Sequence, residues 1–162
     1  MEGLTPSQKG AFAEAAITAA AVQLRLVVLR PLAEGGRYDL LFDLEPDFLR
    51  VQCKLARRLD GVLRVGLQTS RCTPSGYVRT SYTADEVDMI ATYSPELHRC
   101  FLIPIEEAQD RRSIHLRLEP ALNNQMQGVK WARDYDFATV IERLRARLGS
   151  PRPPTGAATL VP

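Results

Sequence analysis

The chain has 162 residues, of which 45% are apolar and 25% are charged. These proportions match those of soluble globular proteins and exclude a collagen-like chain, a disulfide scaffold and wholesale disorder. The net charge is only +2, but 18 of the 21 basic residues are Arg. Because Arg makes bidentate contacts with phosphate, this composition favours a nucleic acid as the partner.

The length favours a single domain. We expect residues 1–148 to form it and residues 149–162, which are rich in Pro, Thr and Gly, to form a disordered tail. The longest apolar stretch, Ala15 to Val22, falls far short of the ~20 residues that a membrane-spanning helix needs. Three cysteines without a CxxC pair indicate reduced thiols. We therefore predict a cytoplasmic protein with no membrane partner.

The first predicted element is a helix. Thr5 or Ser7 should cap it, and a run rich in Ala, Gln and Lys should carry it to about Val22. Its alanines suit close packing against a sheet. The composition then changes to Leu, Val and Arg, which predicts a strand over Leu24 to Leu29.

A β-hairpin is predicted next, because the strand-like runs 38–44 and 48–54 flank the turn pair Pro46-Asp47. With the turn centred between those two residues, one wholly apolar face forms from the facing pairs Leu44 and Leu49, Phe42 and Val51, and Leu40 and Cys53. A slip of one residue would oppose apolar and polar side chains, so a buried face selects this register.

The other face of this hairpin is polar. In the same register, Asp39 lies opposite Lys54, while Gln52 and Arg50 face positions 41 and 43. An acid, an amide and an amine therefore converge within cross-strand contact distance.

The remaining chain predicts more strands and a final helix. Val62 to Gln68 alternates apolar and polar residues after an Asp60-Gly61 turn, which indicates a third strand. Ser70 to Ser81 is too polar for a core and is predicted as a loop. We expect further strands within 90–93, 100–105 and 114–118, a polar loop at 123–125 and a helix over 135–148.

The polar face suits phosphodiester hydrolysis, which needs an oxygen-ligated Mg²⁺ and positive charge where the oxyanion develops. Asp39 would supply the anionic ligand, with Gln52 and the Cys53 carbonyl as further metal contacts. Lys54, on the same face as Gln52, would reach the attacking water or a phosphate oxygen. Glu14 would complete the catalytic set if the first helix packs across the sheet edge. The Cys53 thiol should be buried on the apolar face.

The order of these residues resembles a known family: Gly10-x-x-x-Glu14, then Tyr38-Asp39-Leu40, then Val51-Gln52-Cys53-Lys54. It is similar to the PD-(D/E)XK nuclease superfamily and, more narrowly, to its group I intron-encoded homing endonucleases, over roughly residues 7 to 105. The resemblance implies an α/β fold with a restriction-endonuclease-like mixed β-sheet core flanked by helices, and Mg²⁺-dependent cleavage of double-stranded DNA.

This sequence departs from the family pattern at two positions. No proline precedes Asp39, and Gln52 replaces the usual second acid, a replacement known in the intron branch. A neutral amide binds a hard cation less strongly than a carboxylate does. The site would therefore rely more on DNA phosphate for tight metal binding.

Eight residues are candidate DNA contacts: Arg57, Arg58, Arg71, Tyr77, Arg79, Asn123, Asn124 and Gln125. Arg57 and Arg58 follow the Lys54 strand, where the phosphate backbone of bound DNA would pass. An ordinary solvated turn is the alternative interpretation of these two residues. The next three could enter a groove from the predicted loop, with a simple hairpin as the alternative. The amides could read adenine edges, yet such residues also populate ordinary turns.

The sequence favours a homing endonuclease that acts as a homo-oligomer, a dimer or tetramer, since one site cuts one strand. Three alternatives stay open. A Holliday-junction resolvase or repair-type nuclease would share the catalytic set, an inert DNA-binding module would share only the fold, and a purely structural protein would bind no DNA.

Overall fold

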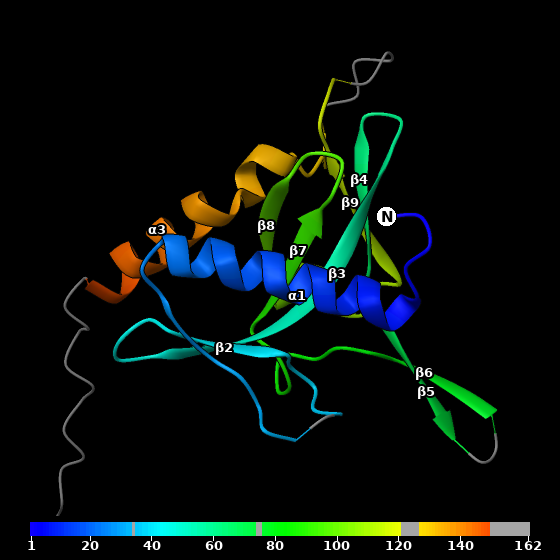
Figure 1. The fold of residues 1–162 in the computed structure, drawn as a ribbon. Helices are drawn as coiled ribbons and strands as arrows, with labels where there is room; N and C mark the ends of the chain where they lie inside the picture. The colour runs from blue at the N-terminus through cyan, green and yellow to red at the C-terminus, as the bar shows by residue number, and fades with distance from the viewer. Residues whose placement is uncertain (34, 74–75, 121–126, 150–162) are drawn as a thin grey trace, which may run out of the picture.

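The computed structural model describes residues 1–33, 35–73, 76–120 and 127–149, and of residues 69–73 and 77–79 it describes the backbone alone. The elements in these ranges, in chain order (Figure 1), are α1 Pro6–Gln23, β1 Val27–Leu29, β2 Leu40–Asp43, β3 Phe48–Leu59, β4 Val62–Gly66, β5 Gln68–Thr73, β6 Gly76–Ser81, β7 Met89–Ser94, β8 Arg99–Pro104, α2 Ile105–Ala108, β9 Ser113–Arg117, the 3-10 helix η1 Ala132–Tyr135 and α3 Phe137–Gly149.

Helix α1 begins and ends with specific backbone signals. The Thr5 side chain accepts a hydrogen bond from the Gln8 N–H, and the Gln8 side-chain oxygen accepts one from the Thr5 N–H, which is a capping box. At the other end Arg25 takes a left-handed φ of 59°, and the Leu26 N–H donates to a helix carbonyl. Residues 24–26 form this helix cap, so β1 begins at Val27 and is shorter than the predicted strand.

The larger sheet is mixed, as the family resemblance implied. Its main path runs β1-β2-β3-β4-β9 with antiparallel neighbours, while β7 pairs with β3 in parallel and with β8 antiparallel. Strands β5 and β6 form a separate two-stranded sheet that extends from the body of the molecule (Figure 1). The segment predicted as a polar loop is therefore a hairpin, the alternative that the sequence left open.

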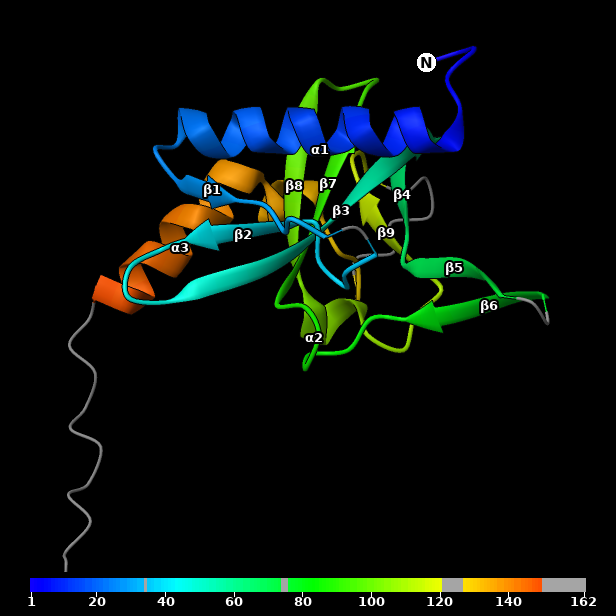
Figure 2. The ribbon, with the colours of Figure 1, turned by 60° about the horizontal axis from the view of Figure 1, so that its bottom comes forward.

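Two apolar clusters cover the two faces of the sheet. On one face α1 and α3 pack against the sheet, with Ile17, Phe42 and Ile141 fully or almost fully buried. Figure 2 shows α1 lying across β3, β7 and β8. On the other face α2 and η1 join a second cluster that includes Ile90 and Phe101. The implied fold, a mixed sheet flanked by helices, is confirmed.

The register of the β2–β3 hairpin differs from the prediction by two residues. Leu40 pairs with Val51 instead of Cys53. The turn explains the shift: the Leu44 N–H donates to the Asp47 carbonyl at 2.9 Å, so the turn is centred one residue earlier than predicted.

A shift of two residues leaves every side chain on its predicted face, because side chains alternate with a period of two. Asp39 therefore stays on the polar face. It now lies beside Gln52, whose amide donates to it, instead of directly opposite Lys54.

The C-terminal region follows the prediction within the described residues. α3 begins at Phe137, two residues after the predicted start, because η1 precedes it. The predicted tail, 149–162, begins one residue too early, because Gly149 is the last residue of α3. The rest of the tail, 150–162, and the loop 123–125 lie outside the described residues. Within the described part of the chain, no helix is long and apolar enough to cross a membrane.

Candidate active site

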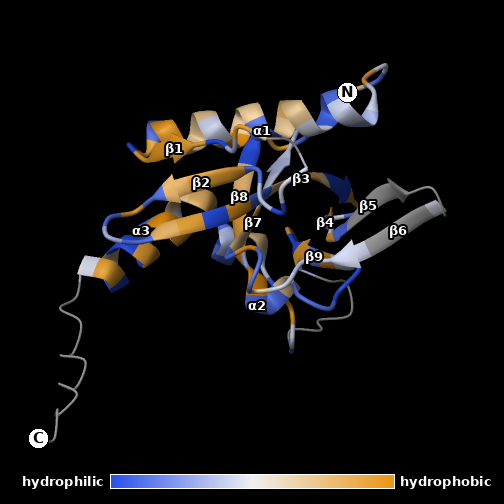
Figure 3. Ribbon diagram, turned by 90° about the horizontal axis from the view of Figure 1, so that it is seen from below, coloured by the Kyte–Doolittle hydropathy of each residue, from blue (hydrophilic) through white to orange (hydrophobic). Residues whose placement is uncertain are grey.

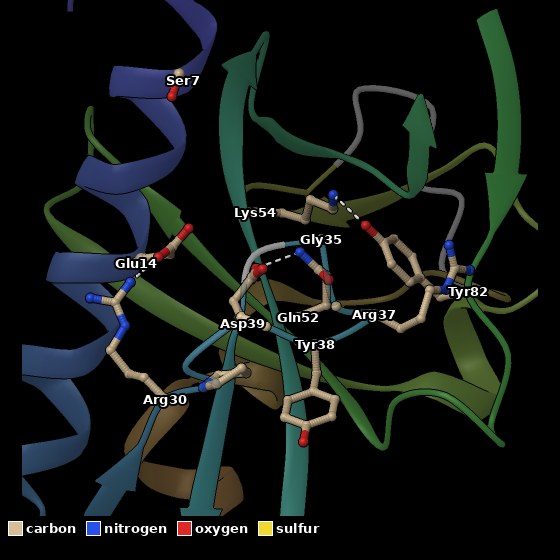
Figure 4. Close-up of a pocket in the computed structure, with 13 residues that line it drawn as sticks. Ser7, Glu14, Arg30, Gly35, Arg37, Tyr38, Asp39, Gln52, Lys54 and Tyr82 are labelled. Carbon is tan, nitrogen blue, oxygen red and sulfur yellow. Dashed lines mark hydrogen bonds and ion pairs between the residues drawn. The ribbon is translucent and has the colours of Figure 1, made fainter. Parts of the chain in front are cut away.

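The four predicted catalytic residues converge on one cavity. Asp39 directly precedes β2, Gln52 and Lys54 lie on β3, and Glu14 projects from α1 (Figure 4). Gln52 and Lys54 share a face because they are two residues apart on an extended strand. The cavity measures about 520 Å³ and is lined in addition by Ser7, Arg30, Pro31, Ala33, Gly35, Gly36, Arg37, Tyr38 and Tyr82.

Asp39 is held by donors on β3. Its Oδ2 atom accepts hydrogen bonds from the Cys53 backbone N–H, at 2.7 Å, and from Gln52 Nε2. Burial raises the pKa of Asp39, and the Cys53 N–H, the Lys54 charge and the Gln52 amide lower it only in part, so the pKa stays above its ordinary value. The Asp39 carboxylate would therefore be stabilised by a further cation nearby.

Glu14 brings a second carboxylate to the same region. The Arg30 guanidinium donates to it at 2.5 Å. Partial burial raises the pKa of Glu14, the charge of Asp39 raises it further, and Arg30 lowers it only in part. The two carboxylates thus repel each other despite the arginine.

Lys54 extends along the opposite wall of the cavity. Its Nζ donates to the Tyr82 hydroxyl at 2.7 Å. The Lys54 charge also lowers the pKa of Asp39, so the ammonium lies within electrostatic range of that carboxylate. Figure 4 shows Glu14, Asp39, Gln52 and Lys54 around the same space.

The oxygen atoms of this site are suitable ligands for a hard divalent cation. Gln52 Nε2 donates both to the Asp39 carboxylate and, at 3.4 Å, to the Cys53 carbonyl, so a positively polarised group already lies against two oxygens that Mg²⁺ could bind. Within the described ranges, no group of three or more His, Cys, Asp and Glu could hold a metal. Glu14 and Asp39 would therefore need neutral oxygens or substrate phosphate to complete the coordination.

The Cys53 thiol points away from this chemistry. The residue is 7% exposed and belongs to the apolar cluster under α1. Burial raises the pKa of the Cys53 thiol well above its usual value. The predicted burial of this thiol is confirmed.

The candidate DNA contacts are only partly described. Arg57 and Arg58 lie on β3 beyond Lys54 and are exposed, so this segment is strand and not the solvated turn. Their side chains point to opposite faces, and Arg58 donates to Glu119 at 3.0 Å.

The other six lie where side chains are not described. The backbones of Arg71, Tyr77 and Arg79 belong to the β5–β6 hairpin, whereas Asn123, Asn124 and Gln125 lie outside the described residues.

Arg30, Arg37 and Tyr82 are among the polar residues of the cavity that were not predicted as site residues from the sequence. Arg30 follows the short strand β1, and Arg37 lies in the connection to β2. Tyr82 follows β6 and lay within the stretch that carried the family resemblance. No local spacing links these residues to Asp39 or Lys54, because the hairpin and the β1–β2 connection bring them together only in the folded chain.

Comparisons with known proteins show the family and support the fold. A family model described as PD-(D/E)XK endonuclease matches residues 4–138. The structure of the bacterial homing endonuclease I-Ssp6803I is similar, with a TM-score of 0.73 and 23% sequence identity, over 92% of this chain and 100% of that chain. At this identity, the structural match supports the fold. The comparison with curated proteins found no match.

Proposed function

Because the chain belongs to the PD-(D/E)XK endonuclease family, we propose that it is a Mg²⁺-dependent endonuclease that hydrolyses phosphodiester bonds of double-stranded DNA. One observation carries this proposal: Glu14, Asp39, Gln52 and Lys54 come from three separate elements and line one cavity. Two half-buried carboxylates with raised pKa values and a nearby ammonium match the needs of phosphate chemistry.

Each residue has a distinct proposed role. Asp39, with Glu14, Gln52 and the Cys53 carbonyl, would hold the cation, which when bound polarises the phosphate and acidifies a water. The Cys53 N–H and the Gln52 amide hold the Asp39 carboxylate in place. Lys54 supplies positive charge where the phosphate oxygen becomes more negative during attack.

The finer proposal is sequence-specific homing by a group I intron-encoded enzyme. It rests on the family motif with Gln at position 52 and on the fold shared with a homing endonuclease. A Holliday-junction resolvase or repair-type nuclease with the same catalytic set would instead prefer a four-way junction to linear duplex.

We further propose that the protein acts as a homo-oligomer, since one site cuts one strand and a double-strand break needs two. Strand β1 lies at an edge of the sheet and is apolar (Figure 3), with Val27 62% and Leu29 42% exposed. An exposed apolar edge suits pairing with another copy. Light scattering coupled to gel filtration would give the number of subunits.

The decisive experiment measures nicking of supercoiled plasmid with Mg²⁺ or EDTA. We expect metal-dependent nicking by the native protein and its loss in Asp39→Ala and Lys54→Ala. Binding of both variants to duplex DNA in Ca²⁺ should persist. Lys9→Ala, which removes a lysine that does not line the cavity, is the matched control. DNA binding without nicking by the native protein would identify an inert DNA-binding module, and absence of both would refute the proposal.

A further inference from the structure

Tyr82 lies at the base of the β5–β6 hairpin, one residue after β6 ends. It is 4% exposed, and its ring packs in the second apolar cluster. Its hydroxyl faces the cavity and meets the Lys54 ammonium (Figure 4). The side chain thus joins the core of the protein to the catalytic lysine.

The Tyr82–Lys54 contact fixes a side chain that is otherwise flexible. Lys54 Nζ lies 2.7 Å from the Tyr82 hydroxyl and 4.9 Å from the ring centre. A lysine side chain has four flexible bonds, and ordering it before the reaction removes an entropic cost from the transition state. From this geometry we propose that Tyr82 is a positioning residue, which holds the Lys54 ammonium ready for phosphodiester hydrolysis. This inference rests on the proposed nuclease function.

Arg37 in turn holds Tyr82. Its guanidinium carbon lies 5.0 Å from the centre of the Tyr82 ring. The same guanidinium donates to the Ser81 carbonyl at 2.8 Å and to the Glu86 carboxylate at 2.6 Å. Arg37 is therefore held by residues that precede and follow Tyr82 in the chain. The ring is therefore fixed by packing and by a cation, which leaves the hydroxyl at a defined place.

The nature of the partner matters for the charge of Lys54. A neutral hydroxyl accepts the hydrogen bond without neutralising the ammonium, so the full positive charge stays available to a phosphate. Lys130 provides a contrast within the same molecule. It contacts the Tyr135 hydroxyl at 3.3 Å but also forms an ion pair with Glu107, which compensates its charge.

The contact can be measured without any assay of activity, because the chain has only three lysines: Lys9, Lys54 and Lys130. NMR of the lysine side-chain ammonium groups should show a hydrogen-bonded, motionally restricted Lys54 signal in the native protein. In Tyr82→Phe, which keeps the ring, that signal should move to the position and mobility of a free lysine. An unchanged Lys54 signal would overturn the proposed contact.

Catalysis is tested by single-turnover nicking of supercoiled plasmid with Mg²⁺ at saturating protein. We expect Tyr82→Phe to slow the step about tenfold, the loss typical of one hydrogen bond to a charged group. Its affinity for duplex DNA in Ca²⁺ should be unchanged, which separates positioning from binding. Tyr93→Phe, which removes the hydroxyl of a tyrosine that does not line the cavity, should keep the native rate.

The possible outcomes separate this inference from the proposed function. The positioning role would be overturned if Tyr82→Phe nicked DNA at the native rate, or if it lost DNA affinity and nicking rate by the same factor. Neither result would contradict the proposed nuclease function. No nicking by the native protein would refute the nuclease function and with it the catalytic role of the contact, while the NMR measurement would still show whether Tyr82 restrains Lys54.

Discussion

Gln52→Glu is the most informative single change, because it converts the site to the acidic pair common in the family. Gln52 is 8% exposed and donates to the Asp39 carboxylate and the Cys53 carbonyl. The variant loses both hydrogen bonds and places a further carboxylate against Asp39. The nearby Glu14, whose pKa is already raised by burial and by the charge of Asp39, adds to the repulsion.

The cost can be estimated from these contacts. Two hydrogen bonds, one to a charged acceptor, contribute about 2–3 kcal/mol. Repulsion between two carboxylates about 4 Å apart adds up to about 4 kcal/mol at an effective dielectric constant of about 20. Proton uptake by the introduced carboxyl relieves part of this sum. We expect the free energy of unfolding in EDTA at neutral pH to fall by about 3–5 kcal/mol.

The assay is urea unfolding of Gln52→Glu and the native protein, in EDTA and then in Ca²⁺. Calcium should raise the free energy of unfolding of the variant more than that of the native protein, because a carboxylate at position 52 is a stronger ligand than the amide. At 100 times its Kd the ion contributes about 2.7 kcal/mol. Gln23→Glu, an exposed position, should cost less than about 1 kcal/mol as the control. Equal stability of Gln52→Glu and the native protein in EDTA would refute the electrostatic reasoning.

Three side chains that are not proposed to bind the metal give further predictions. Partial burial raises the pKa of Asp88, but the hydrogen bonds from Arg50 and the Arg50 charge have a larger effect and lower that pKa below its usual value. The Arg50–Asp88 contact therefore stabilises the folded protein above the pKa that Asp88 has in the unfolded chain. This stabilisation is lost as the pH falls through the lower pKa of the folded state. Asp88→Asn should therefore unfold about 1–2 kcal/mol more easily at neutral pH, and its urea midpoint should converge with the native one in acid. Cys53→Ala should keep metal-dependent nicking, and the native Cys53 should resist thiol reagents until the protein unfolds, because the thiol is buried. Ile17→Ala, a fully buried position between α1 and the sheet, should lower the free energy of unfolding by about 2–5 kcal/mol in urea titrations, whereas an exposed Val22→Ala should change it by less than about 1 kcal/mol.

The sequence was most informative where chemistry follows local alternation. The two-residue spacing of Gln52 and Lys54 fixes their common face on any extended strand, and the apolar residues between and beside them fix which face is buried. For the same reason Asp39 stayed on the polar face although the predicted register was wrong by two residues. Errors of an even number of residues preserve faces, which is why the polar face was predicted correctly from a wrong pairing.

The sequence was least informative about contacts between distant segments. Whether Glu14 reaches the cavity depends on the angle at which α1 packs across β3, which the spacing of its alanines does not set. The turn centre depended on one backbone hydrogen bond, from Leu44 to Asp47, that the residue types alone left undecided. The segments that form β5 and β6 were predicted as a loop because they contain too few apolar residues to show the alternation of a half-buried strand.

The amino-acid sequence by itself determined the capped first helix, the hairpin with one apolar and one polar face, and the presence of Asp39, Gln52 and Lys54 on that polar face. Only the tertiary structure decided that Arg30 meets Glu14 and that Tyr82 meets Lys54. The physical reason is range: alternation and capping act over a few residues, whereas these contacts join segments that only the assembled sheet and the packed helix bring together.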